Sequence, residues 1–408
     1  MTRTHRPTRI RPTSRRKVLI SGAGIAGPAL AFWLNRHGYA VTVVERAGAP
    51  RSGGYPVDVR GTALEVVRRM GILPRLREAH VDSRRFTFLD GDGAEVASIA
   101  PHTVAGSAAG RDLEVRRGDL TDALHAAVRD DVEFLFDDWI DTLDQSGDGV
   151  DVTFRGGARR TFDMVFGADG LHSRTRELVF GPEEQFHRYL GYCFAVFTLR
   201  NTFGLSHEIT MWNTPGRAAA LYAVADDDVV HAFLNFARPE PPSAADAFRD
   251  PQARRDLVAA VFADAGWEVP GLIAAMREAD DLFVDVAGQI RMPRWSSGRV
   301  ALVGDAAYAP SFLTGQGTSL ALVGAYMLAD SLAGRDAAEG FAAYEHATRA
   351  FVTLNQDQVG VGDAPLFPTT ARALERRNDM LRKLRTLPAA QDRPAHSALT
   401  LPEFTPAR

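Results

Sequence analysis

A glycine-rich turn between two apolar strands constrains the fold of this chain most strongly. Residues 18–20 are β-branched or aliphatic, as in a buried parallel strand, and Gly22, Gly24 and Gly27 follow directly. In a G-x-G-x-x-G turn the first glycine allows the bend, the second lets backbone amides approach a pyrophosphate, and the third lets the next helix pack closely. Residues 26–37 have the pattern of that helix. The segment therefore predicts a dinucleotide site.

An acidic residue follows the next strand at the spacing that a ribose site requires. Residues 39–44 form a second apolar run, and Glu45 stands at its end, about 20 residues beyond the glycines. A carboxylate at this place accepts hydrogen bonds from both ribose hydroxyls and disfavours a 2′-phosphate. The sequence therefore favours FAD or NAD over NADP as the bound dinucleotide.

A second glycine-rich turn lies far along the chain. An apolar strand pattern over residues 300–303 ends at Gly304 and Asp305, and a long apolar helix begins at the glycine-rich residues 315–318. Asp305 is placed to accept a hydrogen bond from a sugar or ribityl hydroxyl, beside a helix N-terminus that favours negative charge. No second strand–G-x-G-x-x-G–helix unit occurs in the sequence. We therefore expect two distant segments to serve one dinucleotide site.

An all-β pattern over residues 189–237 indicates a different kind of sheet. Its segments alternate apolar and polar side chains between polar or Pro-Gly breaks, as in an open antiparallel sheet. An aromatic face of such a sheet is suited to cover a flat organic ligand. Each candidate on that face also fits an ordinary core position. The candidate substrate residues from this region are Met211, Trp212, Phe233 and Asn235.

Composition argues against several classes of function. The net charge of −4 over 408 residues gives no reason to expect a nucleic-acid partner. The single cysteine, Cys193, lies in an apolar run and is expected to be a buried thiol, while the scattered histidines do not support a metal site. Because no run of about 18 apolar residues occurs, we expect no membrane span and a cytoplasmic protein.

Several segments together resemble the single-component FAD monooxygenases of the para-hydroxybenzoate hydroxylase family. The chain is most similar to the antibiotic and polyketide hydroxylases, including the tetracycline-inactivating enzymes. The matching segments are the first glycine turn with Glu45 and Arg46, GGYPVDVRG at 53–61, R-x-x-L at 117–120, GADGLHSRTR at 167–176, and GDAAYAPSFLTGQGTS at 304–319. The resemblance implies an α/β fold, in which a Rossmann-like FAD-binding domain is interleaved with a substrate domain built on an antiparallel sheet, followed by C-terminal helices.

The resemblance also implies which part of FAD each segment holds. The first glycine turn would hold the pyrophosphate, Glu45 the adenosine ribose, and Arg46 would lie along the adenine. Arg117 would contact the phosphate and ribityl region. Asp169 belongs to a motif that the family uses both for FAD and for a transiently bound NADPH.

The remaining segments would surround the flavin. Asp305 would accept from the ribityl chain, residues 315–318 would lie against the pyrimidine end of the isoalloxazine, and Asp58 would lie near its reactive edge. The candidate cofactor residues are Gly22, Gly24, Ala26, Gly27, Glu45, Arg46, Gly54, Asp58, Arg117, Asp169, Gly304, Asp305, Gly315, Gly317 and Thr318. Phe312 joins the four candidate substrate residues.

The reaction implied is the insertion of one oxygen atom from O₂. NADPH or NADH would reduce FAD, a C4a-hydroperoxide would form, and its distal oxygen would hydroxylate or epoxidise an aromatic or polycyclic substrate, as in antibiotic biosynthesis. No acid–base pair can be identified from the sequence, so no general base is named. The alternatives are a dehydrogenase, reductase or halogenase on the same fold, and a non-redox cyclisation or rearrangement. No halogenase W-x-W-x-I-P motif surrounds Trp212 or Trp295.

The chain departs from the family pattern in the second glycine segment. Tyr308 stands where the family usually has His, residues 310–312 replace a Pro-Pro pair, and Ser319 replaces the usual Asn. These changes affect residues that the family places around the flavin and the substrate.

The order of the patterns predicts discontinuous domains. We expect the FAD-binding domain to comprise residues 17–74, 106–180 and 285–340, and the substrate-binding domain residues 75–105 and 181–284. Helices are expected over residues 341–386, with a disordered extension at 1–16 and a disordered tail at 387–408. We expect a monomer or a homodimer.

Overall fold

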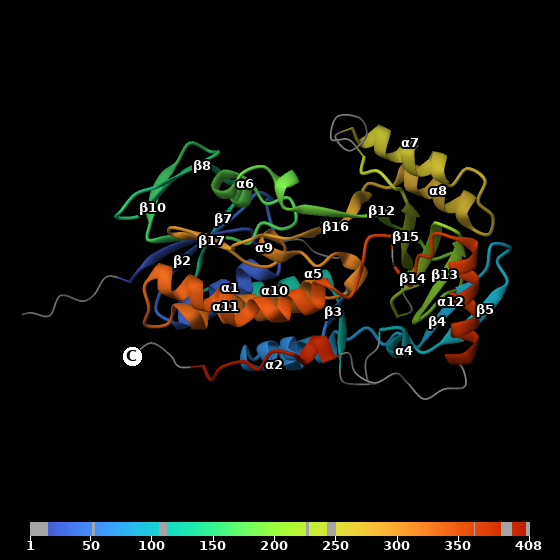
Figure 1. Ribbon diagram of the computed structural model, residues 1–408, viewed down its shortest axis with the longest axis horizontal. Coiled ribbons are helices and arrows are strands. Elements are labelled where there is room, and N and C mark those ends of the chain that lie inside the picture. The colour runs from blue at the N-terminus through green and yellow to red at the C-terminus, as the bar shows by residue number, and fades with distance from the viewer. Residues whose placement is uncertain are drawn as a thin grey trace, which may run out of the picture.

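The computed structural model describes residues 15–50, 54–105, 112–225, 228–242, 250–362, 364–384 and 394–404. Two sheets dominate it, one mainly parallel and one mainly antiparallel, and they lie side by side (Figure 1). The long strands β12 and β16 lead from one part to the other. The expected combination of a Rossmann-like part and an antiparallel substrate part is confirmed.

The parallel sheet has the strand order β17-β18-β11-β1-β2-β7. β1 lies between β2 and β11. Successive side chains of a strand point to opposite sides of the sheet, so alternate residues of β1 face different layers. Val18 and Ile20 face the helices, whereas Leu19 packs against a second, three-stranded sheet. This burial on both faces explains the continuous apolar run in the sequence. The strands are β1 Lys17–Ser21, β2 Ala40–Glu45, β7 Glu133–Phe136, β11 Met164–Gly167, β17 Ser296–Ser297 and β18 Val300–Leu302.

The helices on one face of this sheet share one hydrophobic core with it. α10 packs against α1, α2 and α11, and it is buried along nearly its whole length, which explains its almost uniformly apolar sequence. The helices of this part are α1 Ala26–Arg36, α2 Thr62–Arg69, α3 Leu73–Glu78, α5 Arg117–Ala126, α6 Arg174–Phe180, α9 Asp305–Tyr308, α10 Gly317–Leu332 and α11 Ala337–Gln356. The opposite face is covered by β8 Ile140–Gln145, β9 Val150–Phe154 and β10 Arg159–Phe162.

The antiparallel part has the strand order β16-β12-β15-β14-β13-β4-β5, in which only the β13–β4 pair is parallel among the described strands. α7 Pro251–Val261 and α8 Val269–Glu278 cover one face, and α12 Ala371–Leu384 lies beside β5 (Figure 1). The strands are β4 Arg85–Leu89, β5 Glu95–Ile99, β12 His187–Arg200, β13 Glu208–Thr214, β14 Arg217–Ala223, β15 Val229–Ala237 and β16 Phe283–Ile290. A domain boundary expected at residue 285 falls inside β16.

A short two-stranded ribbon forms a separate small sheet. It consists of β3 Pro56–Val59 and β6 Leu113–Arg116. The remaining short helices are α4 Pro101–Ala105, η1 Glu183–Gln185, η2 Phe312–Thr314 and η3 Pro394–Ser397.

The C-terminal segment corrects one expectation. Residues 394–404 pack against the FAD-binding part instead of forming a disordered tail, because Leu399 and Leu401 are buried in its core and side chains of α2 bind the backbone carbonyls of the segment. The hydroxyl of Thr62 donates to the carbonyl of Leu399 at 2.7 Å, and Arg69 donates to that of Pro402 at 2.5 Å. Most of the expected N-terminal extension, residues 1–14, and residues 387–393 and 405–408 of the expected tail lie outside the described residues.

Candidate functional site

The first glycine turn is shaped by close backbone contacts. A Cβ added to Gly22, whose φ is +104°, would lie 2.5 Å from the carbonyl oxygen of Ala168, and one on Gly27 would lie 1.9 Å from that of Gly22. A Cβ on Gly24 meets nothing within 4 Å. Gly22 and Gly27 are therefore required for packing, whereas Gly24 borders the open space that a pyrophosphate needs beside the N-terminus of α1.

Glu45 lies at the edge of this turn. Its carboxylate accepts the amide of Ala23 at 2.8 Å and that of Ala47 at 2.9 Å. Each oxygen has further acceptor capacity, so the side chain can still receive ribose hydroxyls. Arg46 follows it and is exposed.

The second glycine turn meets the first in space. A Cβ on Gly304 would lie 3.0 Å from the Cβ of Ala26 and 3.6 Å from that of Ala321, so the β18–α9 turn lies between the first turns of α1 and α10. A Cβ on Gly317 would lie 3.7 Å from Oδ1 of Asp305. The structure thus joins the two distant segments as expected, with two helix N-termini near one another.

Asp305 lies close to Arg117 and to a tyrosine that the sequence reasoning missed. Burial raises the pKa of Asp305, and the charge of Arg117 opposes this shift. Burial also raises the pKa of Tyr55, against the charge of Arg117. The backbone of Gly54 approaches Arg117 as well, because a Cβ there would lie 3.6 Å from the Cβ of Arg117. The only sequence signal for Tyr55 was its place directly after the Gly-Gly pair.

The ribbon is attached to the start of α10. A Cβ on Gly315, whose φ is +65°, would lie 3.2 Å from Oδ2 of Asp58. Asp58 forms an ion pair with Arg60 at 2.7 Å, and the hydroxyl of Ser319 accepts the amide of Arg60 at 3.1 Å. The serine that departs from the family pattern therefore connects α10 to β3. Thr318 is buried in the first turn of the same helix.

Asp169 has a structural role in the loop before α6. Its carboxylate accepts both the amide and the hydroxyl of Thr175 at 2.9 Å, and it also accepts the hydroxyl of Ser173. These bonds satisfy backbone and side-chain donors at the N-terminus of the helix. A contact with a nicotinamide nucleotide remains a prediction.

The candidate substrate residues separate into two groups. Phe233 contacts the edge of Tyr55, with 5.5 Å between ring centroids, and Oδ1 of Asn235 is buried without a hydrogen-bond partner among the described residues. Phe312 is 37% exposed and packs on Phe194, with 4.3 Å between ring centroids. These three side chains remain candidates, each for its own reason. Phe233 contacts Tyr55, Asn235 has an unused buried acceptor, and Phe312 retains exposed surface.

The other two substrate candidates lie on opposite faces of the sheet, and only Trp212 is on the face away from Phe233. Trp212 packs in the core beneath α7 and α8, on the face of the sheet opposite to Phe233, and its Nε1 donates to the carbonyl of Gly91 at 3.1 Å. Met211 lies on the same face as Phe233, in the core cluster of Phe88 and Leu381 against which Phe233 packs, so its contact with a substrate stays a prediction. Alternation identifies two faces of a strand, but it does not say which face a helix covers.

Tyr308 points into the core. It is buried, and its hydroxyl lies 2.8 Å from that of Tyr344, which in turn donates to the carbonyl of Leu302 at 3.3 Å. The absence of a side chain at Gly324 makes room for the Tyr308 hydroxyl. This departure from the family pattern is thus accommodated by packing between α10 and α11.

His172 links the two parts of the molecule, and the sequence reasoning missed it. Its Nδ1 lies 2.8 Å from Glu183, and its Nε2 lies 3.3 Å from Asp285 on β16. Hydrogen bonds to Asp285 and Glu183 raise the pKa of His172 to about 10, although burial opposes the shift. The imidazolium therefore donates from both ring nitrogens at neutral pH. The pairing depends on β16 and could not be read from the local motif.

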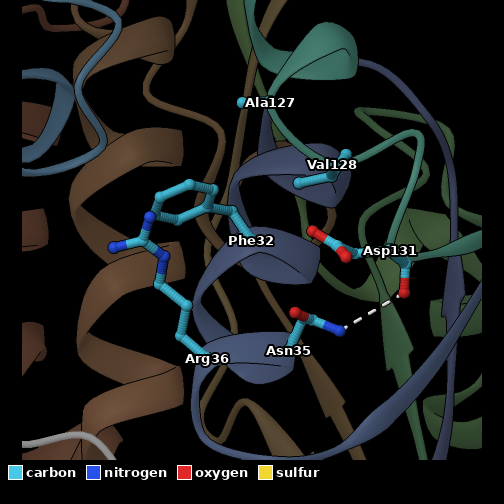
Figure 2. A pocket seen from close by; sticks show the side chains of 6 residues that line it. All are labelled: Phe32, Asn35, Arg36, Ala127, Val128 and Asp131. Atoms are coloured by element: carbon cyan, nitrogen blue, oxygen red, sulfur yellow. Dashed lines mark hydrogen bonds between the residues drawn. The ribbon is translucent and has the colours of Figure 1, made fainter.

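A small hollow at the other end of α1 is separate from this site. Figure 2 shows its lining residues, and its volume is about 50 Å³. The amide of Asn35 donates to the carbonyl of Asp131 at 3.3 Å, and Arg36 lies over the ring of Phe32. Its size and its distance from the glycine turns along α1 exclude it as the place of a dinucleotide.

Other kinds of site find no support in the part of the chain that the structure describes. It contains no group of three or more His, Cys, Asp or Glu side chains that could hold a metal ion. None of its helices combines the length and apolar character needed to cross a bilayer. Cys193 is buried, and this burial raises the pKa of its thiol.

Comparisons with known proteins agree with the geometry. Residues 15–359 match the FAD binding domain family. An uncharacterised protein of Mycobacterium tuberculosis is 45% identical over 83% of this chain and 91% of its own length. A flavin-dependent monooxygenase from an unknown prokaryotic organism is 35% identical over 95% of this chain and 99% of its own. The crystal structure of the tetracycline destructase Tet(55) is similar with a TM-score of 0.81 and 34% identity, covering 96% of this chain and 99% of that one.

The open space at Gly24, the adjoining helix N-termini and the position of Asp305 all fit FAD. This chain therefore belongs to the FAD binding domain family and is a FAD-dependent monooxygenase of the para-hydroxybenzoate hydroxylase type.

Proposed function

We propose that this monooxygenase uses NADPH or NADH to hydroxylate or epoxidise an aromatic or polycyclic, polyketide-like small molecule. The observation that carries the proposal is the meeting of the two glycine turns next to Tyr55, which contacts Phe233 on the antiparallel sheet. This arrangement suits a flat cofactor at the glycine turns, with a flat substrate next to it at the antiparallel sheet. The similarity to a tetracycline destructase supports a polycyclic substrate.

The residues of the chain would hold FAD by hydrogen bonds and fixed dipoles. The amides around Gly24 and the N-terminus of α1 would bind the pyrophosphate, and Glu45 would accept the adenosine ribose. Arg117 would lie near the phosphates and Asp305 near the ribityl chain. When bound, FAD supplies the electron transfer from the nicotinamide and the activation of O₂.

The start of α10 would stabilise negative charge at the pyrimidine end of the ring. The amides of Gly317 and Thr318 lie in its first turn, where the helix dipole is positive. Phe233 and Phe312 would exclude water and orient the carbon that is oxidised. We further propose a cytoplasmic monomer or homodimer with no nucleic-acid partner.

The test begins with FAD-loaded protein and a panel of polycyclic phenols. We expect substrate-stimulated oxidation of NADPH or NADH and incorporation of isotopically labelled O₂ into the product. Product formation without O₂ and without a nicotinamide would contradict oxygenation and favour a rearrangement. No stimulation by any member of the panel would contradict the proposed substrate class.

A pair of variants tests the substrate face. Asn235→Ala removes an unused buried acceptor, so we expect KM for the substrate to rise about threefold to tenfold, the equivalent of one neutral hydrogen bond. Trp212→Phe is the matched control on the opposite face of the sheet, and its KM should stay unchanged.

A further inference from the structure

Two acidic residues face each other on the β3–β6 ribbon. Asp58 and Glu114 are directly opposite in the antiparallel register. The Cβ atoms of such a pair lie about 4.5–5.5 Å apart, and their side chains point to the same face. Since Asp58 lies at the Gly315 turn, the ribbon places a second carboxyl group close to the proposed flavin position.

Hydrogen bonds connect Glu114 to the antiparallel sheet and to a half-buried serine. The hydroxyl of Ser83 donates to Oε2 of Glu114 at 3.1 Å and lies 2.8 Å from the hydroxyl of Tyr222 on β14. Tyr222 packs with Phe233, one of the remaining substrate candidates. Ser83 is half-buried between exposed neighbours, so this chain of hydroxyl and carboxyl groups runs from near the surface to the substrate face.

The charges around Glu114 differ from those around Asp58. Asp58 has its own ion pair with Arg60, whereas burial and the negative charge of Asp58 raise the pKa of Glu114 to about 7. Hydrogen bonds from Tyr222 and Ser83 and the charge of Arg60 oppose this shift. Glu114 therefore exchanges a proton near neutral pH, where a general base is most effective.

Two other titratable groups lie against Glu114. The ring of His80 is exposed and lies 3.0 Å from the backbone carbonyl of Glu114, so it contacts the main chain rather than the carboxyl group. Burial and the charge of Glu114 hold the pKa of Tyr222 well above its usual value. Tyr222 consequently remains a neutral hydroxyl that can donate or accept a hydrogen bond.

We propose that Glu114 is the general base of this monooxygenase and that its substrate carries an acidic phenol or enol hydroxyl. The inference rests on the proposed function. The carboxylate of Glu114 takes the hydroxyl proton: the substrate O–H bond breaks, a carboxyl O–H bond forms, and the electron pair stays on the substrate oxygen. The substrate anion is richer in electrons at the carbon that receives oxygen. Glu114 is not oxidised or reduced, and it returns its proton to the product or, through Ser83, to solvent.

The first experiment does not depend on turnover. Infrared difference spectra of FAD-loaded protein, recorded across pH, should show a protonated carboxyl band that is lost with a midpoint of about 7. Glu114→Gln should abolish this band, and Glu78→Gln, a control at an exposed side chain at the end of α3, should retain it. A band unchanged in Glu114→Gln, or no band with a midpoint near neutrality in the wild type, would overturn the proposal.

The second experiment follows the proton of a bound ligand. 1-Hydroxypyrene is a polycyclic phenol whose absorbance reports ionisation, and we expect the FAD-loaded wild type to bind part of it as the anion at about pH 8, where Glu114 is ionised and the free phenol is mostly neutral. Glu114→Gln should bind the neutral form, and Glu114→Asp should restore part of the shift. An identical shift in Glu114→Gln, or failure of the wild type to bind or ionise the dye, would contradict the proposal.

Turnover then separates this inference from the proposed function. For a phenol that stimulates the wild type, Glu114→Gln should lower kcat/KM at pH 7 by about 10²–10⁴-fold and remove the limb of the pH profile near neutrality. FAD binding should be retained. A pH profile of Glu114→Gln that matches the wild type refutes the role of Glu114 but not the proposed function. Absence of oxygenation by the wild type itself refutes the proposed function.

Discussion

Gly324 in α10 offers a sharp test of the packing around Tyr308. Replacing a helical glycine by alanine normally stabilises a protein by about 0.5–1 kcal/mol. Here a Cβ would lie 1.8 Å from the Tyr308 hydroxyl, 3.0 Å from Cζ of the same ring and 3.5 Å from Val303. Overpacking of this kind typically costs about 1–3 kcal/mol. We therefore expect Gly324→Ala to lower the free energy of unfolding by up to about 2.5 kcal/mol after the helix gain is subtracted.

The assay is urea unfolding of FAD-saturated protein, followed by circular dichroism and by flavin fluorescence. Gly271→Ala is the matched control, because Gly271 lies in α8 and a Cβ there meets nothing within 4 Å. It should raise the free energy of unfolding by about 0.5–1 kcal/mol.

A double-mutant cycle tests whether the destabilisation by Gly324→Ala comes from the Tyr308 hydroxyl oxygen. Tyr308→Phe removes the hydroxyl that clashes, at a cost of about 1 kcal/mol for the lost bond to Tyr344. In this background Gly324→Ala should cost clearly less than it does alone. The reasoning is refuted if Gly324→Ala is as stabilising as Gly271→Ala, or if its cost is the same with Phe at position 308.

Three further predictions concern the cofactor turn, the link between the two parts, and the C-terminal segment. Gly24→Ala should leave the free energy of unfolding of the FAD-free protein within about 0.5 kcal/mol, because its Cβ has room, yet weaken FAD binding in a fluorescence titration. His172→Gln should lower the free energy of unfolding most below pH 6.5, because a raised pKa stabilises the folded state only while the imidazole is protonated. Urea titrations should show that the difference in unfolding free energy between the variant and the wild type vanishes as the pH rises through about 10. A deficit that grows with pH would contradict this sign. Deletion of residues 394–408 should lower the melting temperature, because Thr62 and Arg69 lose their carbonyl partners; an unchanged melting temperature would show that these bonds contribute little.

The sequence predicts those parts of the site that depend on local backbone geometry. In the first glycine turn, Gly27 needs the absence of a Cβ because of its contact with Gly22 within one βαβ unit, whereas the close contact of Gly22 is with Ala168, beyond that unit. The second turn is predicted from its strand–glycine–helix pattern, and in the structure Gly304 approaches Ala26 of the first unit. Their meeting was inferred from the lack of another dinucleotide motif, and the structure bears it out.

The sequence does not predict features that depend on pairing between distant strands. Glu114 became a candidate only when its register opposite Asp58 was known. The face occupied by Trp212 depends on where α7 and α8 pack, which strand alternation does not specify. The segment 394–404 lies in a proline-containing C-terminal stretch, but Leu399 and Leu401 are buried in the core and its carbonyls are bound by side chains remote in sequence.

The central claim is that FAD lies between the first glycine turn and the start of α10. A crystal structure of the FAD-loaded protein tests it most directly. We expect the pyrophosphate at the amides near Gly24, the ribityl chain within hydrogen-bond distance of Asp305, and the pyrimidine end of the ring at Gly317. A pyrophosphate bound elsewhere, or a flavin ring remote from Gly317, would contradict it.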